Sequence, residues 1–469
     1  MIKFLLNNNI VSTLLPAGTL LLDFVRYHQH LHGTKIGCRE GDCGACTVLV
    51  GSLNTQGQVV YRSATSCLMP IGNAQGKHIV TVEGTNIQGL NFIQQAFSNE
   101  GASQCGFCTP GFMVSLAGFC LQANAEPTYE QGIDAVNGNI CRCTGYKSIE
   151  RAIGTIANKL TTRQQESAVD FAVNNQILPE YFKQIPDKLM ALQTELSVMP
   201  NNPALPMSIV GGGTDLYVQK HDSMTERNDL YFAQRESHLS EIAQVNDLCF
   251  LGSSTTVTDI AESPIFKAHF EEWQAVIKLV SSTPIRNMAT LAGNFINASP
   301  IGDFSILFLA LDAQLQFASM GNTQARQLPL RKLYKGYKQL DKQPDEYVER
   351  IFFQLPDAQT KVNFEKVCKR AHLDIASVNT AICLHLHSDG TIAKAGLSAG
   401  GVAPVPAFLP KTSAYMEGKV PSRQLLNEVC ALAQTEIAPI GDVRGSVAYK
   451  RLLLDQLIEA HFIKLFPQL

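Results

Sequence analysis

The chain has 469 residues, of which 45% are hydrophobic and 17% charged, and its formal net charge is -3. This length exceeds what one hydrophobic core supports, so we expect three or four folded domains. The charge balance gives no sign of a basic face for nucleic acid, and no apolar run reaches the roughly 18 residues that span a bilayer. An Asn7-Asn8-Asn9 run interrupts the apolar start that a signal peptide needs. We therefore predict a cytoplasmic protein with reduced thiols and with no nucleic-acid or membrane partner.

Cysteines are concentrated near the start of the chain, where three of the 13 lie in the stretch CREGDCGAC. Cys38, Cys43 and Cys46 are spaced C-x4-C-x2-C, and Cys67 follows later. This is the spacing of plant-type 2Fe–2S ferredoxins, and the intervening glycines permit the tight turns that such a loop requires. The stretches CTVLV and VVYRSATSC predict a hairpin that returns Cys67 to the loop. Structural zinc also takes four thiolates, but zinc ribbons pair two C-x2-C motifs.

A second cysteine set follows. Cys105 and Cys108 lie in SQCGFCTPGF, and Cys141 and Cys143 lie in NICRCTGY. Each pair precedes a predicted helix, so the positive ends of two helix dipoles favour the anionic sulfurs. Cys120 falls between the two motifs and is predicted to be a buried core residue rather than a ligand.

These two motifs resemble the two-cluster iron–sulfur unit of the xanthine dehydrogenase and molybdenum hydroxylase family. The resemblance implies a β-grasp ferredoxin domain over residues 1–83 and a helical-bundle domain over residues 84–160. It also implies that each domain holds one 2Fe–2S cluster through its own four cysteines. Residues 161–180 are polar and weakly patterned, and we interpret them as an interdomain linker.

A possible phosphate-binding loop lies in MSIVGGGTDLYVQK, where an apolar strand runs into three glycines. Backbone amides of such a loop can approach a pyrophosphate without obstruction by side chains. A tight turn explains the pattern about as well, and the Rossmann glycine pattern is absent. The stretch IRNMATLAGNFINASPIGDFSILFLALDA adds a second loop of small residues followed by an apolar run.

Together these two stretches resemble the FAD domain of the same family, an α+β domain of the vanillyl-alcohol-oxidase type, here over residues 181–355. The resemblance implies that Thr290, Gly293 and Asn294 line a second FAD loop and that Asp303 bonds polar groups of the cofactor. Asp303 could equally cap the helix that follows it. The resemblance also implies a cradle for the FAD diphosphate made of Ile209, Val210, Gly211, Gly212, Gly213, Thr214, Asp215 and Leu216.

The last third, residues 356–469, resembles the C-terminal α+β domain of carbon monoxide dehydrogenase flavoproteins through AGLSAGGVAP and DVRGSVAYKRLLL. Ile375 and Lys394 fall near positions that touch FAD in relatives, although a core isoleucine and a solvated lysine are open alternatives. Many relatives have an aromatic residue before the IRN stretch, close to the flavin. Val280 stands near that place here, which puts the flavin contact with nicotinamide in doubt.

The resemblance covers nearly the whole chain and implies a multidomain α+β electron-transfer protein. Because the chain ends at Leu469, before any molybdopterin domain, we expect the small subunit of a bacterial enzyme of this family. It would pair with a large molybdopterin-binding subunit, as a heterotetramer, and pass electrons from purine oxidation through two 2Fe–2S clusters to FAD and NAD. No residue of this chain is then a catalytic base. A partner acting on an aldehyde or another N-heterocycle, a freestanding NADH-linked carrier and a zinc-stapled scaffold are the alternatives.

Overall fold

The computed structural model describes residues 1–122, 127–197, 208–319, 322–370 and 373–469. They form two compact units: Met1–Phe232 with Ser282–Met288, and Ala233–Ser281 with Ala289–Leu469. The predicted FAD domain is therefore divided, because its first part and a seven-residue segment belong to the first unit. Among the described residues, no helix combines the length and the apolar character needed to cross a membrane.

The first unit begins with a five-stranded sheet in the order β2-β1-β5-β3-β4, in which β1 and β5 are parallel. The strands are β1 (Ile2–Leu6), β2 (Asn9–Thr13), β3 (Thr47–Leu53), β4 (Val59–Thr65) and β5 (His78–Val80). The short helix α1 (Leu21–Asp23) supplies buried leucines to the core of this sheet. β3 and β4 form the predicted antiparallel hairpin, whose return strand leads to Cys67.

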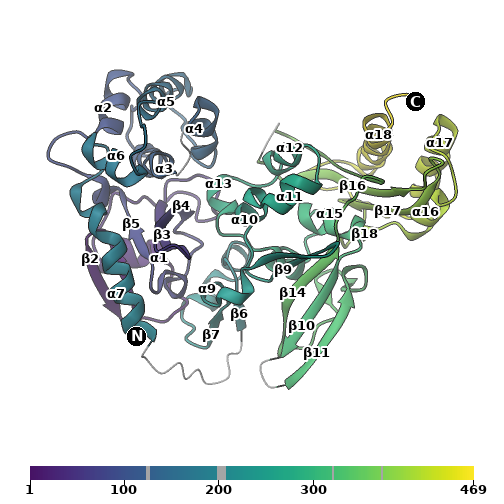
Figure 1. Ribbon diagram of the computed structural model, residues 1–469, viewed down its shortest axis with the longest axis horizontal. Coiled ribbons are helices and arrows are strands. Elements are labelled where there is room, and N and C mark those ends of the chain that lie inside the picture. The colour runs from purple at the N-terminus through teal and green to yellow at the C-terminus, as the bar shows by residue number, and fades with distance from the viewer. Residues whose placement is uncertain (123–126, 198–207, 320–321, 371–372) are drawn as a thin grey trace. The chain divides into compact units, whose positions relative to one another are not determined.

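Four helices form the second layer of the first unit, above the sheet in Figure 1. They are α2 (Phe92–Asn99), α3 (Thr109–Cys120), α4 (Tyr129–Ala135) and α5 (Lys147–Leu160). α5 is amphipathic, and its apolar residues at helical spacing, from Ile149 to Leu160, are all buried as the sequence predicts. α3 is buried on nearly all sides, including Cys120, because it packs against α2, α4 and β3.

The stretch interpreted as a linker is part of the core. Within residues 161–180 lies α6 (Ala168–Asn174), and Phe171, Ile177 and Leu178 are each at most 3% exposed. These few apolar residues pack into the helical layer. The chain then continues through a helical turn at Glu180–Gln184 into α7 (Ile185–Ser197).

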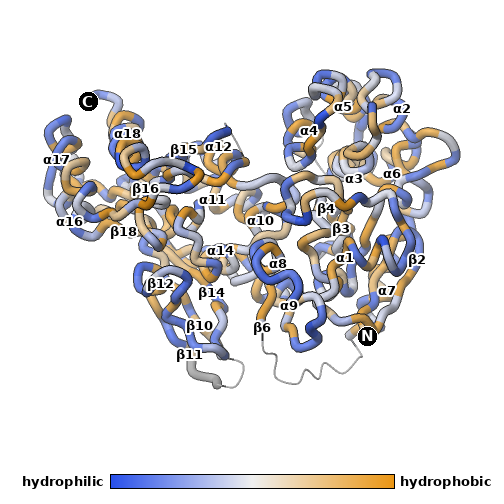
Figure 2. The backbone as a smooth tube through the Cα atoms, turned by 180° about the vertical axis from the view of Figure 1, so that it is seen from behind, coloured by the Kyte–Doolittle hydropathy of each residue, from blue (hydrophilic) through white to orange (hydrophobic). Residues whose placement is uncertain are grey.

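A small βααβ element completes the first unit. Its parts are β6 (Ser208–Val210), α8 (Leu216–Gln219), α9 (His221–Thr225) and β7 (Leu230–Phe232), with the two strands parallel. Figure 2 shows β6 in orange, whereas α9 is mainly blue. The apolar side chains of this element, including Tyr217 and Phe232, join the core of the ferredoxin-type sheet. α13 (Thr283–Arg286) also belongs to this unit.

The second unit contains a five-stranded sheet in the order β11-β10-β14-β9-β8. Its strands are β8 (Ile242–Val245), β9 (Leu248–Gly252), β10 (Gln314–Ser319), β11 (Asn322–Pro329) and β14 (Glu346–Gln354). The helices that share its core are α10 (Val257–Glu262), α11 (Pro264–His269), α12 (Trp273–Lys278), α14 (Leu291–Asn297) and α15 (Asp303–Ala310). α15 is the apolar run predicted to be buried, and each residue after Asp303 is buried.

A second sheet of this unit has the order β15-β16-β17-β18, and β12 (Tyr334–Gly336) pairs with β13 (Gln339–Leu340) in a separate hairpin. The strands are β15 (Thr360–Cys368), β16 (Ala376–Leu386), β17 (Ile392–Gly400) and β18 (Ala407–Phe408). The helices are α16 (Pro410–Met416), α17 (Arg423–Ala433) and α18 (Val447–Leu465), and α18 packs on β15 and β16.

Among the described residues, each unit has one buried histidine. Both nitrogens of His78 are bonded, to Tyr61 Oη at 2.9 Å and to the Asn7 carbonyl at 2.8 Å. His461 is bonded to Asn363 and Thr380, each at 2.8 Å. Burial lowers the pKa of His78 from 6.5 to about 4 and that of His461 from 6.5 to about 3.

We expect both units to lose stability in mild acid. Because each folded-state pKa is depressed, the unfolded chain binds more protons below pH 6.5, and the stabilisation present above that pH declines as pH falls. At pH 5 the loss is about 2 kcal/mol per histidine. Thermal melts from pH 8 to pH 5 should show His461→Gln with a flatter pH dependence than wild type. The exposed control His238→Gln should follow wild type, and parallel curves for all three proteins would contradict the argument.

Candidate cofactor sites

The four cysteines of the first set converge as two thiol pairs. Cys38 and Cys43 are hydrogen-bonded to each other, and the Cys38 amide also donates to Cys43 Sγ at 3.4 Å. Cys46 and Cys67, both almost fully buried, form the other pair. A charge on Cys38 raises the pKa of both Cys46 and Cys67, so the two pairs lie close together.

Hydrogen bonds prepare this set to hold anionic sulfur. The Cys43 thiol, supported by backbone amides, lowers the pKa of Cys38 to about 5 against the effect of burial. A hydrogen bond from Cys67 likewise lowers the pKa of Cys46, whereas the pKa values of Cys43 and Cys67 are raised by their partners. A metal ligand must be a thiolate, and these hydrogen bonds favour the thiolate form of Cys38 and Cys46.

The loop that carries these cysteines is held from outside by Arg39. This residue has a positive φ of 59°, and its guanidinium pairs with Asp23 at 2.7 Å and 3.1 Å. The same group lies 3.4 Å from His221 Nε2, on α9. The backbone of Gly41 hydrogen-bonds the Cys67 thiol, which joins the loop to the end of the hairpin.

The second set converges in the same way. The Cys143 thiol donates to Cys105 Sγ at 3.5 Å, and Cys108 and Cys141 are hydrogen-bonded to each other. Burial raises the pKa of Cys108 to about 12. The pKa of Cys141 is lowered, because hydrogen bonds from the Thr144 side chain and backbone outweigh burial.

Helix starts and tight turns position this second set. Cys108 is the residue that caps the start of α3, and α3 has a proline in its first turn, as predicted. Before α5, Tyr146 adopts a positive φ of 68°, and its hydroxyl accepts a hydrogen bond from the Cys141 amide at 3.1 Å. Cys105 and Cys143 are exposed, unlike Cys46 and Cys67 in the first set.

The loops of the two sets are bonded to each other. The Ile140 amide donates to the Cys43 carbonyl at 3.0 Å, and Ile140 directly precedes Cys141. Asn139, which is 5% exposed, donates to the Gly44 carbonyl at 3.1 Å. Gly44 has a φ of +69°, and a Cβ atom there would lie 2.4 Å from the Gly138 carbonyl. Only glycine fits this contact.

The 282–288 segment also supports both loops. The Thr283 amide and hydroxyl donate to Asn137 Oδ1 and the Asp134 carbonyl, just before the C-x-C pair of Cys141 and Cys143, at 2.8 Å and 2.7 Å. Asn287 donates to the Ser63 carbonyl on β4 at 2.8 Å. The sequence motifs do not indicate this role or that of Asn139, although Asn139 lies two residues before a cysteine motif.

The glycine loop predicted to hold the FAD diphosphate lies in the first unit. Gly211, Gly212 and Gly213 follow β6, and α8 begins with Leu216. Gly213 has a φ of +85°, and its carbonyl accepts a hydrogen bond from the Tyr217 amide at 2.9 Å. The remaining predicted residues of this cradle flank the loop: Ile209 and Val210 in β6, and Thr214 and Asp215 before α8.

The other predicted FAD residues lie in the second unit. Thr290 caps α14 by accepting a hydrogen bond from the Gly293 amide at 3.2 Å. Asn294 Oδ1 accepts two bonds from Ser305, so the first turns of α14 and α15 are adjacent.

Asp303 does not cap α15. Its carboxylate bonds to Lys366 Nζ at 2.7 Å and to Asn379 Nδ2 at 2.7 Å. Burial raises the pKa of Asp303, and its two partners oppose that shift. Lys366 also donates to the Leu279 carbonyl at 2.7 Å, and Asn379 Oδ1 is a buried acceptor with no partner among the described residues. The Asp303 carboxylate thus bonds two side chains of the second unit, and its contact with FAD stays a prediction.

The three remaining predicted residues, Ile375, Lys394 and Val280, differ in their exposure. Ile375 is 55% exposed rather than a core residue, and Lys394 is an exposed lysine that pairs with Asp312 at 3.0 Å. Val280 is buried at 5% exposure.

The chemistry of the donors suits 2Fe–2S clusters. Each set offers four thiols as two pairs, which matches two irons with two thiolates each. Among the described residues, no group of three or more His, Cys, Asp and Glu side chains is placed to hold a single metal ion. Cysteines 38, 43, 46 and 67 would hold one cluster, and cysteines 105, 108, 141 and 143 the other.

Comparison with known families covers most of the chain. Residues 7–71 match the 2Fe-2S iron-sulfur cluster binding domain, and residues 81–154 match a second 2Fe-2S binding domain. Residues 188–356 match the FAD binding domain in molybdopterin dehydrogenase, and residues 364–465 match the CO dehydrogenase flavoprotein C-terminal domain. These four domains define an iron–sulfur flavoprotein, with the multidomain α+β architecture that the sequence predicts.

Curated relatives give the family. The chain is 26% identical to xanthine dehydrogenase of Blastobotrys adeninivorans over 94% of its own length, and 26% identical to xanthine dehydrogenase 1 of Arabidopsis thaliana over 98%. It spans 39% of the length of either relative. The four matched domains are those of the small subunit of molybdenum hydroxylases, and the relatives that the chain matches are xanthine dehydrogenases.

A solved structure shares the fold of part of the chain. The carbon monoxide dehydrogenase of Hydrogenophaga pseudoflava, in a form lacking the Mo-pyranopterin moiety, aligns with a TM-score of 0.50 at 22% identity. The alignment covers 57% of this chain and 90% of that chain.

Substitution within one cysteine set should remove one cluster and leave the other. We expect Cys46→Ser to lose the signal of the first cluster, and Cys108→Ser that of the second, because each set has no spare thiol ligand. Electron paramagnetic resonance after dithionite reduction, with iron analysis, measures both. Cys120→Ala is the control and should retain wild-type iron, whereas loss of iron in this control or unchanged signals in the other two would refute the assignment.

Gly44 and Gly57 form a matched pair, since both have positive φ but only Gly44 is crowded. Gly57→Ala should destabilise the hairpin by about 1 kcal/mol, the usual penalty of a left-handed alanine. Gly44→Ala should also separate the two cluster loops and lower iron content substantially. Thermal melts and iron per chain compare the two, and equal iron content would show that the loop contact is dispensable.

Proposed function

We propose that this chain is the electron-transfer subunit of a cytoplasmic xanthine dehydrogenase. The observation that carries the proposal is the direct bond between the two cysteine loops, from the Ile140 amide to the Cys43 carbonyl. When bound, two 2Fe–2S clusters and FAD together supply one-electron carriers and a two-electron exchange with NAD. The chain itself would hold these groups, tune them by hydrogen bonds and limit access of water.

The arrangement of the first unit supports a relay order. The second cysteine set has exposed members, Cys105 and Cys143. The loop of the first set contacts both the second set, through Cys43 and Ile140, and the βααβ element, through Arg39 and His221. Electrons entering at the second set would therefore reach the first set before the flavin. His221 on α9 lies next to Arg39 of the first cysteine loop, so this side of the loop faces the βααβ element.

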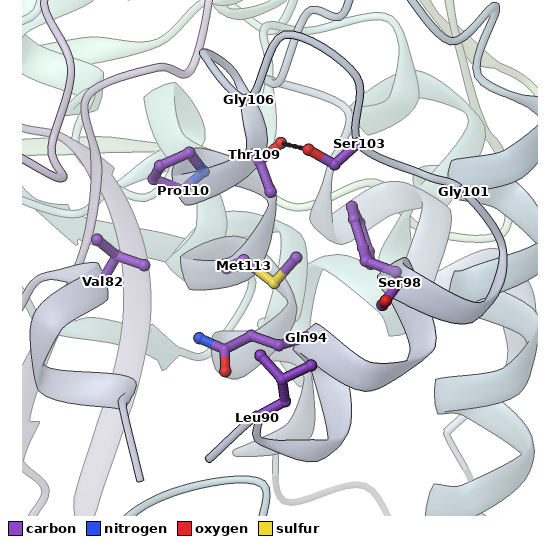
Figure 3. Close-up of a pocket in the computed structure, with 11 residues that line it drawn as sticks. Val82, Leu90, Gln94, Ser98, Gly101, Ser103, Gly106, Thr109, Pro110 and Met113 are labelled. Carbon is purple, nitrogen blue, oxygen red and sulfur yellow. Dashed lines mark hydrogen bonds between the residues drawn. The ribbon is translucent and has the colours of Figure 1, made fainter. Parts of the chain in front are cut away.

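The exposed set offers a docking face for a molybdopterin-binding partner. Phe107, between two of the cysteines, is 47% exposed, and Tyr146 is 39% exposed. A pocket of about 560 Å³ adjoins this loop and is lined by residues that include Leu90, Phe97, Thr109, Pro110 and Met113. Figure 3 shows Leu90, Gln94 and Met113 around this pocket, below the Ser103–Thr109 hydrogen bond. An apolar side chain of a partner would fill it and shield the cluster.

Two comparisons support a partner and a purine substrate. The chain spans 39% of the length of the xanthine dehydrogenases that it matches, and the proposed partner would supply the molybdopterin-binding part. The alignment with the carbon monoxide dehydrogenase covers 90% of that chain and 57% of this one. The aligned part is therefore nearly a whole chain in that protein, which supports division of such proteins into several chains. Relatives named xanthine dehydrogenase favour a purine over an aldehyde or another N-heterocycle.

Isolation of the native complex tests the proposal. The tagged chain should co-purify with a large molybdenum-containing subunit, in a heterotetramer, with about four irons and one FAD per chain. Xanthine should then drive reduction of NAD, measured by absorbance. Turnover of another heterocycle or an aldehyde alone would replace the substrate, and an NADH-oxidising chain with no partner would replace the function.

A pair of variants checks the docking face in the same preparation. Phe107→Glu should abolish co-purification of the partner while iron and flavin remain, because a carboxylate would have to be buried. Tyr337→Glu, at an aromatic residue 64% exposed in the second unit, is the control and should bind the partner normally.

A further inference from the structure

The glycine loop is bonded to a residue of the ferredoxin-type domain that belongs to no cysteine or flavin motif. Asn73 follows Cys67 by six residues and is 3% exposed. Its Nδ2 donates to the Gly211 carbonyl at 2.8 Å. We propose that Asn73 is a positioning residue that orients the loop for the FAD diphosphate, an inference that rests on the flavin site proposed above.

The orientation follows from peptide geometry. In a trans peptide the carbonyl and the next N–H point in opposite directions, and all described peptide bonds here are trans. Because Asn73 holds the Gly211 carbonyl, the Gly212 amide is directed to the other side of the loop. That side is then free to receive an anion through backbone N–H groups.

A glycine loop needs such an external bond. Glycine adopts positive and negative φ almost equally, so peptides in a run of three glycines can flip at little cost. A flipped Gly211–Gly212 peptide would present its carbonyl to the diphosphate and repel it. Asn73 removes this alternative before the ligand arrives, which is the usual gain from preorganisation.

The other end of the loop is fixed from the same stretch. A Cβ atom at Gly213 would lie 2.8 Å from the Leu68 carbonyl, and Leu68 directly follows Cys67. The Tyr217 hydroxyl donates to the Gly18 carbonyl at 2.9 Å, which anchors α8 to the ferredoxin-type sheet. The stretch from Leu68 to Asn73 thus sets both ends of the glycine loop.

Among the described residues, the bond to the Gly211 carbonyl is the one hydrogen bond of the Asn73 side chain, because Asn73 Oδ1 has no partner there. Asn73→Ala deletes the donor, and Asn73→Asp keeps the shape but replaces the donor with an acceptor. Asn99→Ala, on the exposed surface of α2, is the matched control.

The test is ligand binding by the full-length, cluster-loaded chain after removal of its flavin. Calorimetric titrations with FAD, ADP and adenosine should show about tenfold weaker binding of FAD and ADP to Asn73→Ala, and a larger loss in Asn73→Asp. Adenosine, which lacks the diphosphate, should bind all variants alike. Iron content and both paramagnetic signals should match those of wild type and of the control.

The outcomes separate this inference from the proposed function. If wild type binds FAD and ADP, and both Asn73 variants bind them equally well, the positioning role is wrong and the flavin site stands. An equal loss for adenosine and ADP, or loss of cluster signals in both variants, would show a structural role only. If wild type binds neither FAD nor ADP, the flavin site itself fails.

Discussion

The contact between the turn at Cys43–Gly44 and the stretch Asn139–Ile140 is the constraint on which the first unit depends. It joins two cysteine loops that are far apart in the chain through two backbone carbonyls. The approach is close because Gly44 presents no side chain to the Gly138 carbonyl. Both ends of the Asn139 side-chain amide are hydrogen-bonded, since Oδ1 also accepts a bond from the Ser115 hydroxyl at 2.8 Å. A buried amide that is hydrogen-bonded on both sides holds the two cysteine loops at a fixed separation.

Local patterns predicted much of this architecture. The cysteine spacings, the hairpin leading to Cys67 and the amphipathic α5 depend on residues close in sequence, and each is found. The two 2Fe–2S binding domains and the FAD binding domain agree with the matched family models. The buried run after Asp303 was also recognisable, because a helix that is apolar on all sides has few other places to lie.

What the sequence did not reveal depends on contacts between distant residues. The stretch 161–180 has few apolar residues, and burial of Phe171, Ile177 and Leu178 depends on a helical layer formed elsewhere in the chain. Asp303 stands where a helix cap is common, yet its partners Lys366 and Asn379 come from β15 and β16. Burying that ion pair costs free energy, which its extra hydrogen bonds offset. The assignment of the glycine loop and the 282–288 segment to the first unit likewise has no local signal.

The place of the 282–288 segment in the first unit limits where the polypeptide could be cut into two chains. The backbone passes between the units three times, after Phe232, after Ser281 and after Met288. A single break after Phe232 would therefore leave the cluster-bearing fragment without the 282–288 segment, which bonds to Asn137 before the second cysteine set and to Ser63 on β4. If the gene were split into separate iron–sulfur and flavin polypeptides, the 282–288 segment would have to bind the iron–sulfur polypeptide from the other chain. The covalent linkage keeps this segment in place and keeps the iron–sulfur and flavin domains in equal number.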